Sequence, residues 1–299
     1  MKPLVIGTRG SPLALAQVEI IRSLLRNANP SLPVETRIIK TSGDNFVNLS
    51  LVAGGGKGLF TKEIEEQLLG GDIQIAVHSM KDLPTILPEG LIIGAVPPRE
   101  DAHDVFISRN FPSISQLPND ARVATSSIRR RAQLLAKRSD LQVEEIRGNV
   151  ETRLRKLAEN ETLEALILAA AGLRRLGLWK KFGHFHWREI GFETMIPAVG
   201  QGAIACEVRA VDTETRAALA GINDANTAAC VTAERAFLRA LGGGCQVPYA
   251  AHATVERERL RLIGATFGPN GKDVRRVEIF GSMSDPGDAG ERAAEQVIR

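Results

Sequence analysis

The stretch ATSSIRRRAQ, residues 124–133, lies where a predicted strand, 122–125, passes into a predicted helix, 127–138. Its threonine and serines suit the turn between the two elements, because hydroxyl side chains cap the N-termini of helices. The first turn of the helix then contains three arginines, Arg129, Arg130 and Arg131. Positive charge at this end opposes the helix dipole and costs roughly a few tenths of a kcal/mol per residue. A bound carboxylate would remove the conflict, because free N–H groups and guanidinium groups both favour an anion there.

The same succession of strand and helix extends outward in both directions. Apolar runs predict strands at 4–8, 34–40, 73–78, 91–96, 105–108, 142–146, 164–169 and 203–208. One of the predicted helices, 60–69, is expected to keep Glu63, Glu65 and Glu66 on its solvent side. Alternation of this kind is typical of α/β sheets whose faces are covered by helices.

Two breaks interrupt the alternation, PPRED at 97–101 and IPAVGQG at 196–202, and both are expected to be hinges. The chain then changes character after a predicted helix, 227–241. The remaining elements are strands at 249–254, 260–267 and 274–280 and a helical tail. We interpret this last part as a separate, compact α+β domain.

The composition excludes several classes of protein. Aromatic residues make up only 4% of the 299 residues and the net charge is only +3, which disfavours a surface for nucleic acids. No apolar run approaches the ~18 residues that a membrane helix needs. The polar residues 8–11 interrupt the N-terminal stretch that could otherwise resemble a signal peptide. We therefore expect a cytoplasmic protein with a small anionic ligand and with no nucleic-acid or membrane partner.

The chain has three cysteines, Cys206, Cys230 and Cys245, and no C-x-x-C pair. The five histidines show no spacing typical of metal ligands, so no metal site is expected. In the absence of an export signal the thiols are expected to be reduced. Cys245 differs from the others because it follows three glycines in GGGCQVP, 242–248, and therefore has little cover on one side.

Further arginines lie at or just after the ends of predicted strands: Arg9 beside Ser11, Arg147 before Gly148, Arg153, Arg174 and Arg175. Any one of them could be a solvated surface residue. In open α/β sheets, however, ligands bind outside the carboxyl ends of the strands. The repetition favours one cleft that binds a ligand with several carboxylates.

The stretch AVHSMKDLP, 76–84, places one acidic residue among these positive charges. An aspartate in a cationic cleft stays ionised, so Asp82 could stabilise a passing cation or move a proton. The alternative is a loop ion pair between Asp82 and Lys81. The glycine run around Lys57 is not a phosphate loop, because a glycine follows the lysine, and we interpret residues 42–58 as a flap beside the cleft.

Eight motifs occur in this order: GTRGSPLALAQ, GGGKGLFTKEIE, AVHSMKDLP, ATSSIRRRAQ, RGNVETRL, AAAGLRRLGL, PAVGQGA and GGGCQVP. Together they closely resemble the porphobilinogen deaminase family over nearly the whole chain. The resemblance implies two α/β lobes like those of periplasmic binding proteins and a smaller α+β domain. The implied divisions are domain 1 at 1–98 and 199–217, domain 2 at 99–198, and domain 3, with the cofactor cysteine, at 218–299.

The resemblance also implies an activity. The family comprises transferases of porphyrin and heme biosynthesis, usually monomeric, that join four porphobilinogen molecules head to tail into the linear tetrapyrrole hydroxymethylbilane. Ammonia is released at each step. The product grows on a dipyrromethane cofactor, which the resemblance attaches to Cys245 through a thioether.

Site residues follow from the same motifs. Asp82 matches the family's catalytic carboxylate. The cofactor-binding positions correspond to Lys81, Ser127, Arg129, Arg130 and Gly148. The positions that bind substrate carboxylates correspond to Arg9, Ser11, Arg147, Arg153 and Arg175, those that line the cleft to Ser79 and Thr125, and the flap contains Lys57.

The main alternative is a two-lobed protein that binds a small polycarboxylate anion without catalysis. It would share the architecture and the arginines at helix N-termini, but it would leave Cys245 and Asp82 without a role. A thiol-dependent hydrolase is a weaker alternative, because no histidine has a clear place beside Cys245.

Overall fold

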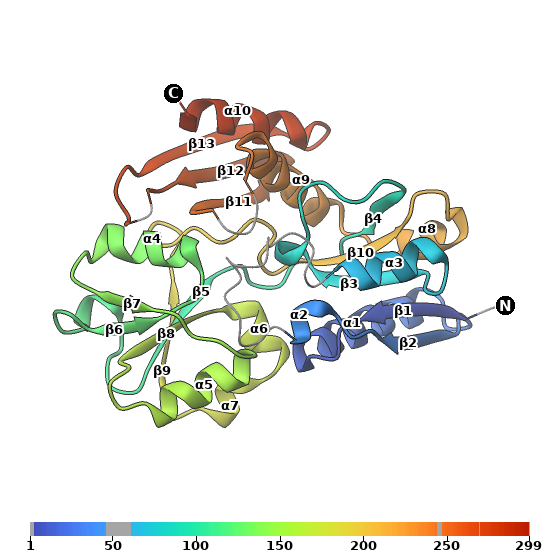
Figure 1. The fold of residues 1–299 in the computed structure, drawn as a ribbon. Coiled ribbons are helices and arrows are strands. Elements are labelled where there is room, and N and C mark those ends of the chain that lie inside the picture. Colours follow the sequence, from blue (N-terminus) through green and yellow to red (C-terminus); the bar gives the residue numbers. More distant parts are fainter. Residues whose placement is uncertain (1–2, 46–60, 244–246, 269, 299) are drawn as a thin grey trace.

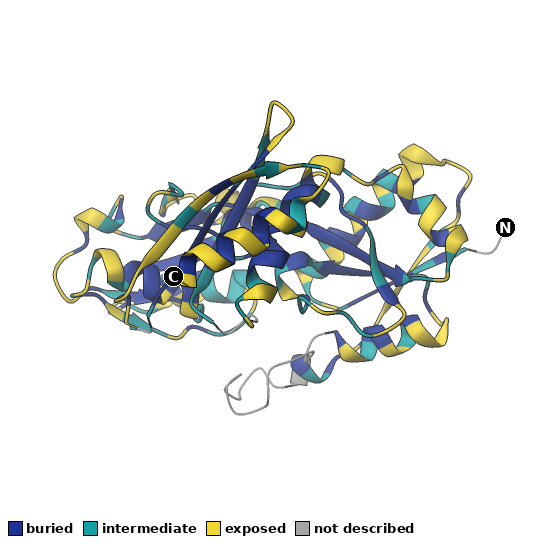
Figure 2. Ribbon diagram, turned by 90° about the horizontal axis from the view of Figure 1, so that it is seen from above, coloured by how far each residue is buried: buried dark blue, intermediate teal, exposed yellow. Residues whose placement is uncertain are grey.

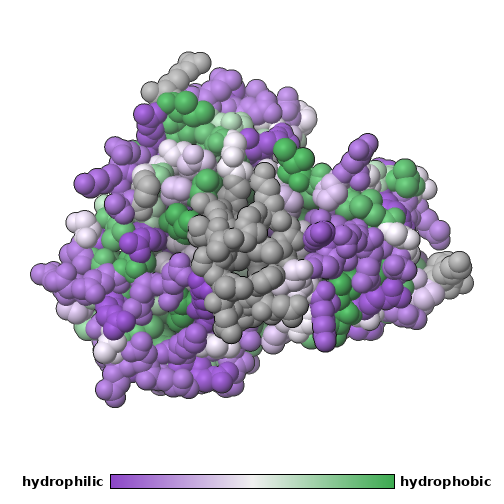
Figure 3. All heavy atoms as spheres, in the orientation of Figure 1, coloured by the Kyte–Doolittle hydropathy of each residue, from purple (hydrophilic) through white to green (hydrophobic). Residues whose placement is uncertain are grey.

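The computed structural model describes residues 3–45, 61–243, 247–268 and 270–298. Figure 1 shows two α/β lobes side by side, with a smaller unit of helices and strands above them. On the face shown in Figure 3, hydrophilic side chains predominate over the described surface of both lobes. Within the described ranges, no helix is both long and apolar enough to span a membrane.

Lobe 1 is built on a five-stranded sheet with the order β2-β1-β3-β10-β4. Its strands are β1 (Leu4–Thr8), β2 (Val34–Ile38), β3 (Ile75–Ser79), β4 (Leu91–Ala95) and β10 (Ile204–Arg209). The first three are parallel, whereas β10 runs antiparallel between β3 and β4. The helices of this part are α1 (Pro12–Ala28), α2 (Ser42–Asn45), α3 (Lys62–Gly70) and α8 (Thr213–Ala220). Lobe 1 therefore combines two separate parts of the chain.

Lobe 2 has a second five-stranded sheet with the order β7-β6-β8-β5-β9. Its strands are β5 (Asp104–Ser108), β6 (Arg122–Ala124), β7 (Gln142–Glu144), β8 (Ala165–Ala169) and β9 (His186–Ile190). The helices α4 (Ile128–Lys137), α5 (Val150–Glu159), α6 (Ala170–Arg175) and α7 (Leu178–Lys181) and the 3-10 turn Ile114–Gln116 complete it. Because β6, β7 and β8 are parallel, the loops that lead into α4, α5 and α6 meet at one edge of the sheet.

The third unit contains an antiparallel sheet with the order β11-β12-β13. Its elements are α9 (Ala225–Ala240), β11 (Tyr249–Glu256), β12 (Arg259–Thr266), β13 (Arg275–Ser282) and α10 (Pro286–Ile298). Both helices pack with the sheet around a core that includes Phe237 and Leu262. The structure thus confirms the predicted fold class, with two α/β lobes and a smaller α+β unit.

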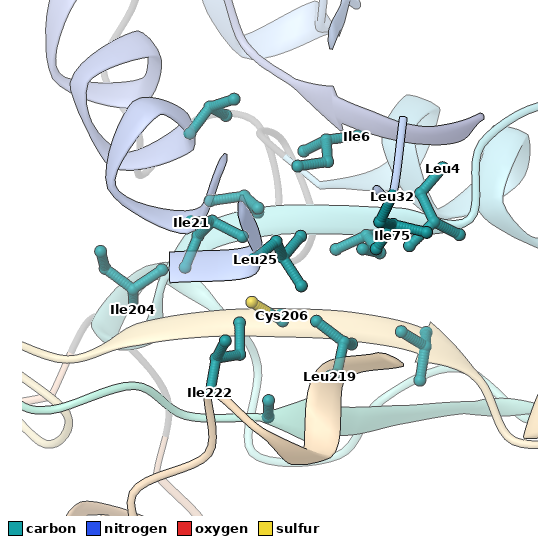
Figure 4. Close-up of a cluster of buried hydrophobic side chains, with 14 residues drawn as sticks. Leu4, Ile6, Ile21, Leu25, Leu32, Ile75, Ile204, Cys206, Leu219 and Ile222 are labelled. Carbon is teal, nitrogen blue, oxygen red and sulfur yellow. The ribbon is translucent and has the colours of Figure 1, made fainter. Parts of the chain in front are cut away.

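Each unit has its own hydrophobic core, and Figure 2 shows buried residues concentrated in the strands while the outer faces of the helices are exposed. In lobe 1, Figure 4 shows the sulfur of Cys206 among Leu25, Leu219 and Ile222. Cys206 and Cys230 are both buried free thiols, as predicted. Burial disfavours the thiolate and raises the pKa of each to about 12, so neither is a reactive nucleophile.

The prediction that Glu65 faces solvent was wrong. On α3 it lies one turn before Leu68, and both side chains are buried. Its carboxyl group comes under the electrostatic influence of Glu207 and His78, which are themselves buried, with Glu207 Oε2 3.2 Å from His78 Nε2. Burial, reinforced by the charge of Glu207, raises the pKa of Glu65.

Two linker segments, 96–103 and 191–203, connect the lobes, and both contact the third unit through Glu234. Its buried carboxylate accepts hydrogen bonds from Arg99 Nη1 at 2.6 Å and Arg99 Nη2 at 3.1 Å. It also accepts the backbone N–H of Gly200 at 2.7 Å and of Ala253 at 2.8 Å. One side chain of α9 thus binds both linkers and strand β11.

We predict that Glu234→Gln lowers the free energy of unfolding at pH 7 by about 3 kcal/mol, because it leaves the Arg99 guanidinium without its counter-charge. Burial alone would raise the pKa of Glu234. The opposing effects, chiefly the positive charge of Arg99, outweigh burial and lower this pKa to about 2. The stabilisation from the Glu234 carboxylate is therefore fully present above the pKa that this group has in the unfolded chain. It is lost as the pH falls toward 2, the pKa of the same group in the folded protein.

Chemical denaturation at several pH values measures this effect. The wild-type protein should lose stability with acid more steeply than the variant. Glu278→Gln is the control, since its ion pair with Arg261 lies on the surface of the same unit and should contribute less than about 1 kcal/mol. Equal losses in the two variants would contradict the prediction.

Candidate active site

The loop after β3 carries three of the predicted site residues. Ser79 ends the strand, and its Oγ accepts a hydrogen bond at 2.8 Å from Nε2 of Gln17, a buried residue of α1. A short 3-10 helix follows, Met80–Asp82, in which Met80 is buried and anchors the turn. Lys81 is partly exposed and Asp82 is exposed. This local structure presents Asp82 at the surface of lobe 1 and leaves Lys81 partly covered.

The N-terminus of α4 has the structure that its sequence predicts. Ser127 is the N-cap, and its Oγ accepts the backbone N–H of Arg130 at 3.3 Å. The buried Thr125 accepts the backbone N–H of Ser127 at 3.2 Å and so fixes the turn. Ser126 bonds to the backbone of Ile146, which places the loop before Arg147 beside this turn.

Arg129 and Arg130 are both buried, and both bind Asp104, the first residue of β5. Arg129 Nη1 lies 2.7 Å from Asp104 Oδ2, and Arg130 Nε lies 2.9 Å from Asp104 Oδ1. Burial alone would raise the pKa of Asp104, but attraction to the two guanidinium groups holds it well below its usual range. Part of the anion predicted at this helix end is therefore a carboxylate of the chain itself.

Four charged side chains from the two lobes influence one another electrostatically. Burial lowers the pKa of Lys81 to about 8, with Arg130 adding to the effect and Asp82 opposing it. Burial also lowers the pKa of Arg153 to about 10, again with Arg130 adding and Asp82 opposing. Lys81 and Asp82 belong to lobe 1, whereas Arg130 and Arg153 belong to lobe 2. We call these four residues the charged cluster.

Arg175 lies beside the linkers rather than within the charged cluster. Its Nη2 donates to the carbonyl of Gly202 at 2.7 Å, and Glu100 is the charge that acts on it most. Burial lowers the pKa of Arg175, which Glu100 opposes. Neighbouring Arg174 is bound to Asp101 and Glu189 at 2.6 Å each.

The remaining predicted residues are placed as follows. Arg153 Nε donates to the carbonyl of Gly148 at 2.8 Å, and Gly148 has a φ of 112°, which suits glycine. Arg147 pairs with Glu145 at 2.9 Å, and no described contact joins it to the charged cluster. Ser11 caps α1 and lies next to Arg9 after β1. Lys57 and Cys245 lie outside the described residues.

Within the described ranges, Asp101, His103 and Glu189 form a group whose oxygen and nitrogen atoms lie within 4.8 Å of one another, as metal ligands would. Arg174 Nη2 lies 2.6 Å from both carboxylates of this group. The guanidinium group therefore already supplies the positive charge that the two acids require, and we interpret the group as an ion-pair network of the linker.

Comparison with known proteins assigns the chain. Residues 4–217 match the model of the "porphobilinogen deaminase, dipyromethane cofactor binding domain", and residues 228–299 match that family's C-terminal domain. The chain belongs to the porphobilinogen deaminase family. This assignment confirms the resemblance read from the eight motifs.

Relatives named porphobilinogen deaminase match over the whole chain. The protein of Geobacillus sp. (strain WCH70) is 46% identical over 299 residues, covering 100% of this chain and 94% of the relative. That of Paracoccus denitrificans is 49% identical over 297 residues, covering 99% and 93%. Among solved structures, the periplasmic aliphatic sulphonate binding protein SsuA from Escherichia coli has a TM-score of 0.44 at 14% identity, covering 80% of this chain and 70% of that one.

The sequence did not point to two residues that the structure places beside Arg129 and Arg130. Asp104 begins a strand that is buried throughout, and a charged residue at the start of such a run was a usable signal. Gln201 is also buried and donates through Nε2 to Asp104 Oδ1 at 2.9 Å and to the carbonyl of Ala102 at 2.7 Å. It lies in the predicted hinge 196–202 and in the motif PAVGQGA, but no role was assigned to this residue.

The dipyrromethane group of the family bears carboxylates, so the site must offer unused donors. Arg129 Nε and Arg175 Nε are buried and have no hydrogen-bond partner among the described residues. A buried donor without a partner is unfavourable unless a ligand or water completes it. Lys81 and Arg153, on which the charge of Asp82 acts, carry the positive charge that carboxylate side chains require. The residues present therefore fit the group.

We predict that Lys81 reacts with acetic anhydride at pH 7 faster than the exposed Lys62, because its pKa of about 8 leaves more of it unprotonated than an ordinary lysine. In Asp82→Asn the loss of the nearby negative charge should lower this pKa further and raise the rate. Competitive labelling with peptide mass spectrometry gives both rates. If Asp82→Asn leaves the acetylation rate of Lys81 unchanged, that result would contradict the electrostatic effect of Asp82 on Lys81.

Proposed function

We propose that this protein joins four porphobilinogen molecules head to tail, with release of ammonia, into hydroxymethylbilane. Membership of the porphobilinogen deaminase family supports the reaction. The charged cluster is the observation that links this reaction to particular residues. In it one carboxylate, Asp82, acts electrostatically on Lys81 of lobe 1 and on Arg153 of lobe 2. A substrate with two carboxylates and a cationic reaction course needs this combination of charges.

We assign roles to the residues on this basis. Asp82 is the catalytic carboxylate and Cys245 holds the dipyrromethane cofactor through a thioether. Further cofactor contacts come from Lys81, Ser127, Arg129, Arg130 and Gly148. Substrate carboxylates bind to Arg9, Ser11, Arg147, Arg153 and Arg175, while Ser79 and Thr125 line the cleft and Lys57 belongs to the flap.

The proposed chemistry follows from charge. When bound, the dipyrromethane group supplies the pyrrole end from which the product grows. Loss of ammonia from the substrate leaves a cation-like electrophile, and the Asp82 carboxylate stabilises the positive charge that develops near the pyrrole N–H. We also assign to Asp82 the role of accepting a proton from the reacting pyrrole. Arginine suits the acid side chains better than lysine, because its planar guanidinium binds a carboxylate through two N–H groups.

We further propose that the units correspond to domain 1 (1–98 and 199–217), domain 2 (99–198) and domain 3 (218–299). We also propose that the protein acts as a monomer in the cytoplasm, with porphobilinogen as its small-molecule partner and with no nucleic-acid partner. The alternative, a binding protein for a polycarboxylate anion, would require neither a covalent cofactor nor Asp82.

The intact mass of the purified protein tests the cofactor. We predict a mass above that of the sequence by one dipyrromethane unit, and Cys245→Ser should remove the excess and the activity. Cys230→Ser is the control and should keep both, since this thiol is buried in the core of the third unit. A fully active protein with an unmodified mass would refute the assignment.

Turnover of porphobilinogen in Asp82→Asn tests the catalytic carboxylate. Because the substitution removes the charge while keeping the shape, kcat should fall by about 100-fold or more with an unchanged melting temperature. Asp82→Glu keeps the charge and should retain part of the activity. Wild-type turnover in Asp82→Asn would remove Asp82 from the mechanism.

A further inference from the structure

Asp104 is the buried carboxylate on which Arg129 and Arg130 of α4 converge. Its Oδ2 accepts from Arg129 Nη1 at 2.7 Å. Its Oδ1 lies 2.9 Å from Arg130 Nε and 2.8 Å from Arg130 Nη2, so that Arg130 approaches it with one edge of the guanidinium plane. Both oxygens are thus used, and the carboxylate is shielded from solvent.

One carboxylate opposes two adjacent cations here. Without it, Arg129 and Arg130 would be two buried guanidinium groups that repel each other and lack a counter-charge. With it, the pair keeps one unit of net positive charge. That remaining charge is what an anionic ligand meets at the N-terminus of α4.

Backbone carbonyls complete the orientation of both arginines. Arg129 Nη1 also donates to the carbonyl of Ile196 at 2.7 Å, and Arg130 Nη1 donates to that of Ile167 at 3.0 Å. Each guanidinium is therefore held at two points, one of which is Asp104. The buried Nε of Arg129 has no partner among the described residues and remains as a donor.

We infer that Asp104 is a positioning residue for the reaction, which holds Arg129 and Arg130 in the orientation that receives the carboxylates of the bound pyrroles. The inference rests on the proposed function, because it concerns arginines assigned to the cofactor. Asp104 is shielded from solvent, and the side chains that it binds are those of the two arginines and Gln201.

The contact with Gln201 extends this role to the linkers. Gln201 Nε2 donates to Asp104 Oδ1 at 2.9 Å, and the Gln201 carbonyl accepts from Arg99 Nε at 2.8 Å. Asp104 itself directly follows the other linker, 96–103. The orientation of the arginines is thus set where both linkers meet lobe 2.

Asp104 also affects Lys81 in the opposite lobe. The charges that act on Lys81 are Asp82 and Asp104, which raise its pKa, and Arg129 and Arg130, which lower it. Removing the charge of Asp104 leaves the two arginines less compensated. The titration of Lys81 should then shift to lower pH, which loss of packing alone would not cause.

Two variants separate charge from position. Asp104→Asn removes the charge, and Asp104→Glu keeps it but displaces the carboxylate by one methylene. Asp140→Asn is the matched control, since Asp140 pairs with Arg138 at 2.6 Å near the surface of the same lobe. The measurements on the full-length chain are cofactor loading by intact mass, kcat and KM, and the titration of Lys81 by NMR of its side-chain carbon atoms.

For Asp104→Asn we expect incomplete cofactor loading, a loss of about 100-fold in kcat/KM, and a Lys81 titration at lower pH. For Asp104→Glu we expect an unchanged Lys81 titration and a loss of about 10-fold in kcat/KM. If Asp104→Asn does not fold, Asp104→Glu alone decides. Asp140→Asn should behave as wild type in all three measurements.

The inference is overturned if a folded Asp104 variant loads the cofactor and turns over like Asp140→Asn. A wild-type protein that carries no cofactor and does not consume porphobilinogen would instead refute the proposed function. In that case the titration of Lys81 still tests whether Asp104 compensates the charges of Arg129 and Arg130, because this measurement requires neither substrate nor cofactor. An unshifted titration in Asp104→Asn would then overturn the inference as well.

Discussion

The arrangement of the three units depends on one buried charge, the carboxylate of Glu234. A carboxylate without solvent must be fully compensated, and the compensation here comes from both lobe linkers and from the sheet of the third unit. If the groups that bind Glu234 separated, its carboxylate would either be exposed to solvent or remain buried without a partner. The linkers are therefore fixed to α9 at one point, and the lobes meet on either side of it.

From this point a continuous series of contacts leads to the proposed cofactor site. Arg99 binds Glu234 and the carbonyl of Gln201, and Gln201 binds Asp104. Asp104 in turn binds Arg129 and Arg130, two of the three arginines at the start of α4. Residues of the third unit, of both linkers and of lobe 2 thus contribute to the position of charges at this site, although none of these contacts is local in sequence.

Much of the fold could be predicted from the sequence because the relevant forces act over short distances along the chain. The start of α4 was predictable from the hydroxyl residues 125–127, and Ser127 is its cap, since capping depends on residues within one helical turn. The counter-charge of Arg129 was not predictable in this way, because Asp104 reaches it only after the sheet has formed. The burial of Glu65 was not predicted for the same reason, because the packing of α3 within lobe 1 determines which face of that helix is buried. Strand β9 was missed because most of its residues are exposed, and only pairing with β5 makes it a strand.

The insertion of β10 between β3 and β4 has a consequence for biosynthesis. All five strands of lobe 2 lie in one continuous part of the chain, 104–190, which leaves the ribosome before β10. Until residues 204–209 emerge, β3 and β4 have no partner on their facing edges, and such edges expose a nascent chain to aggregation. The part of the protein that is synthesised first is therefore the lobe whose sheet is completed last.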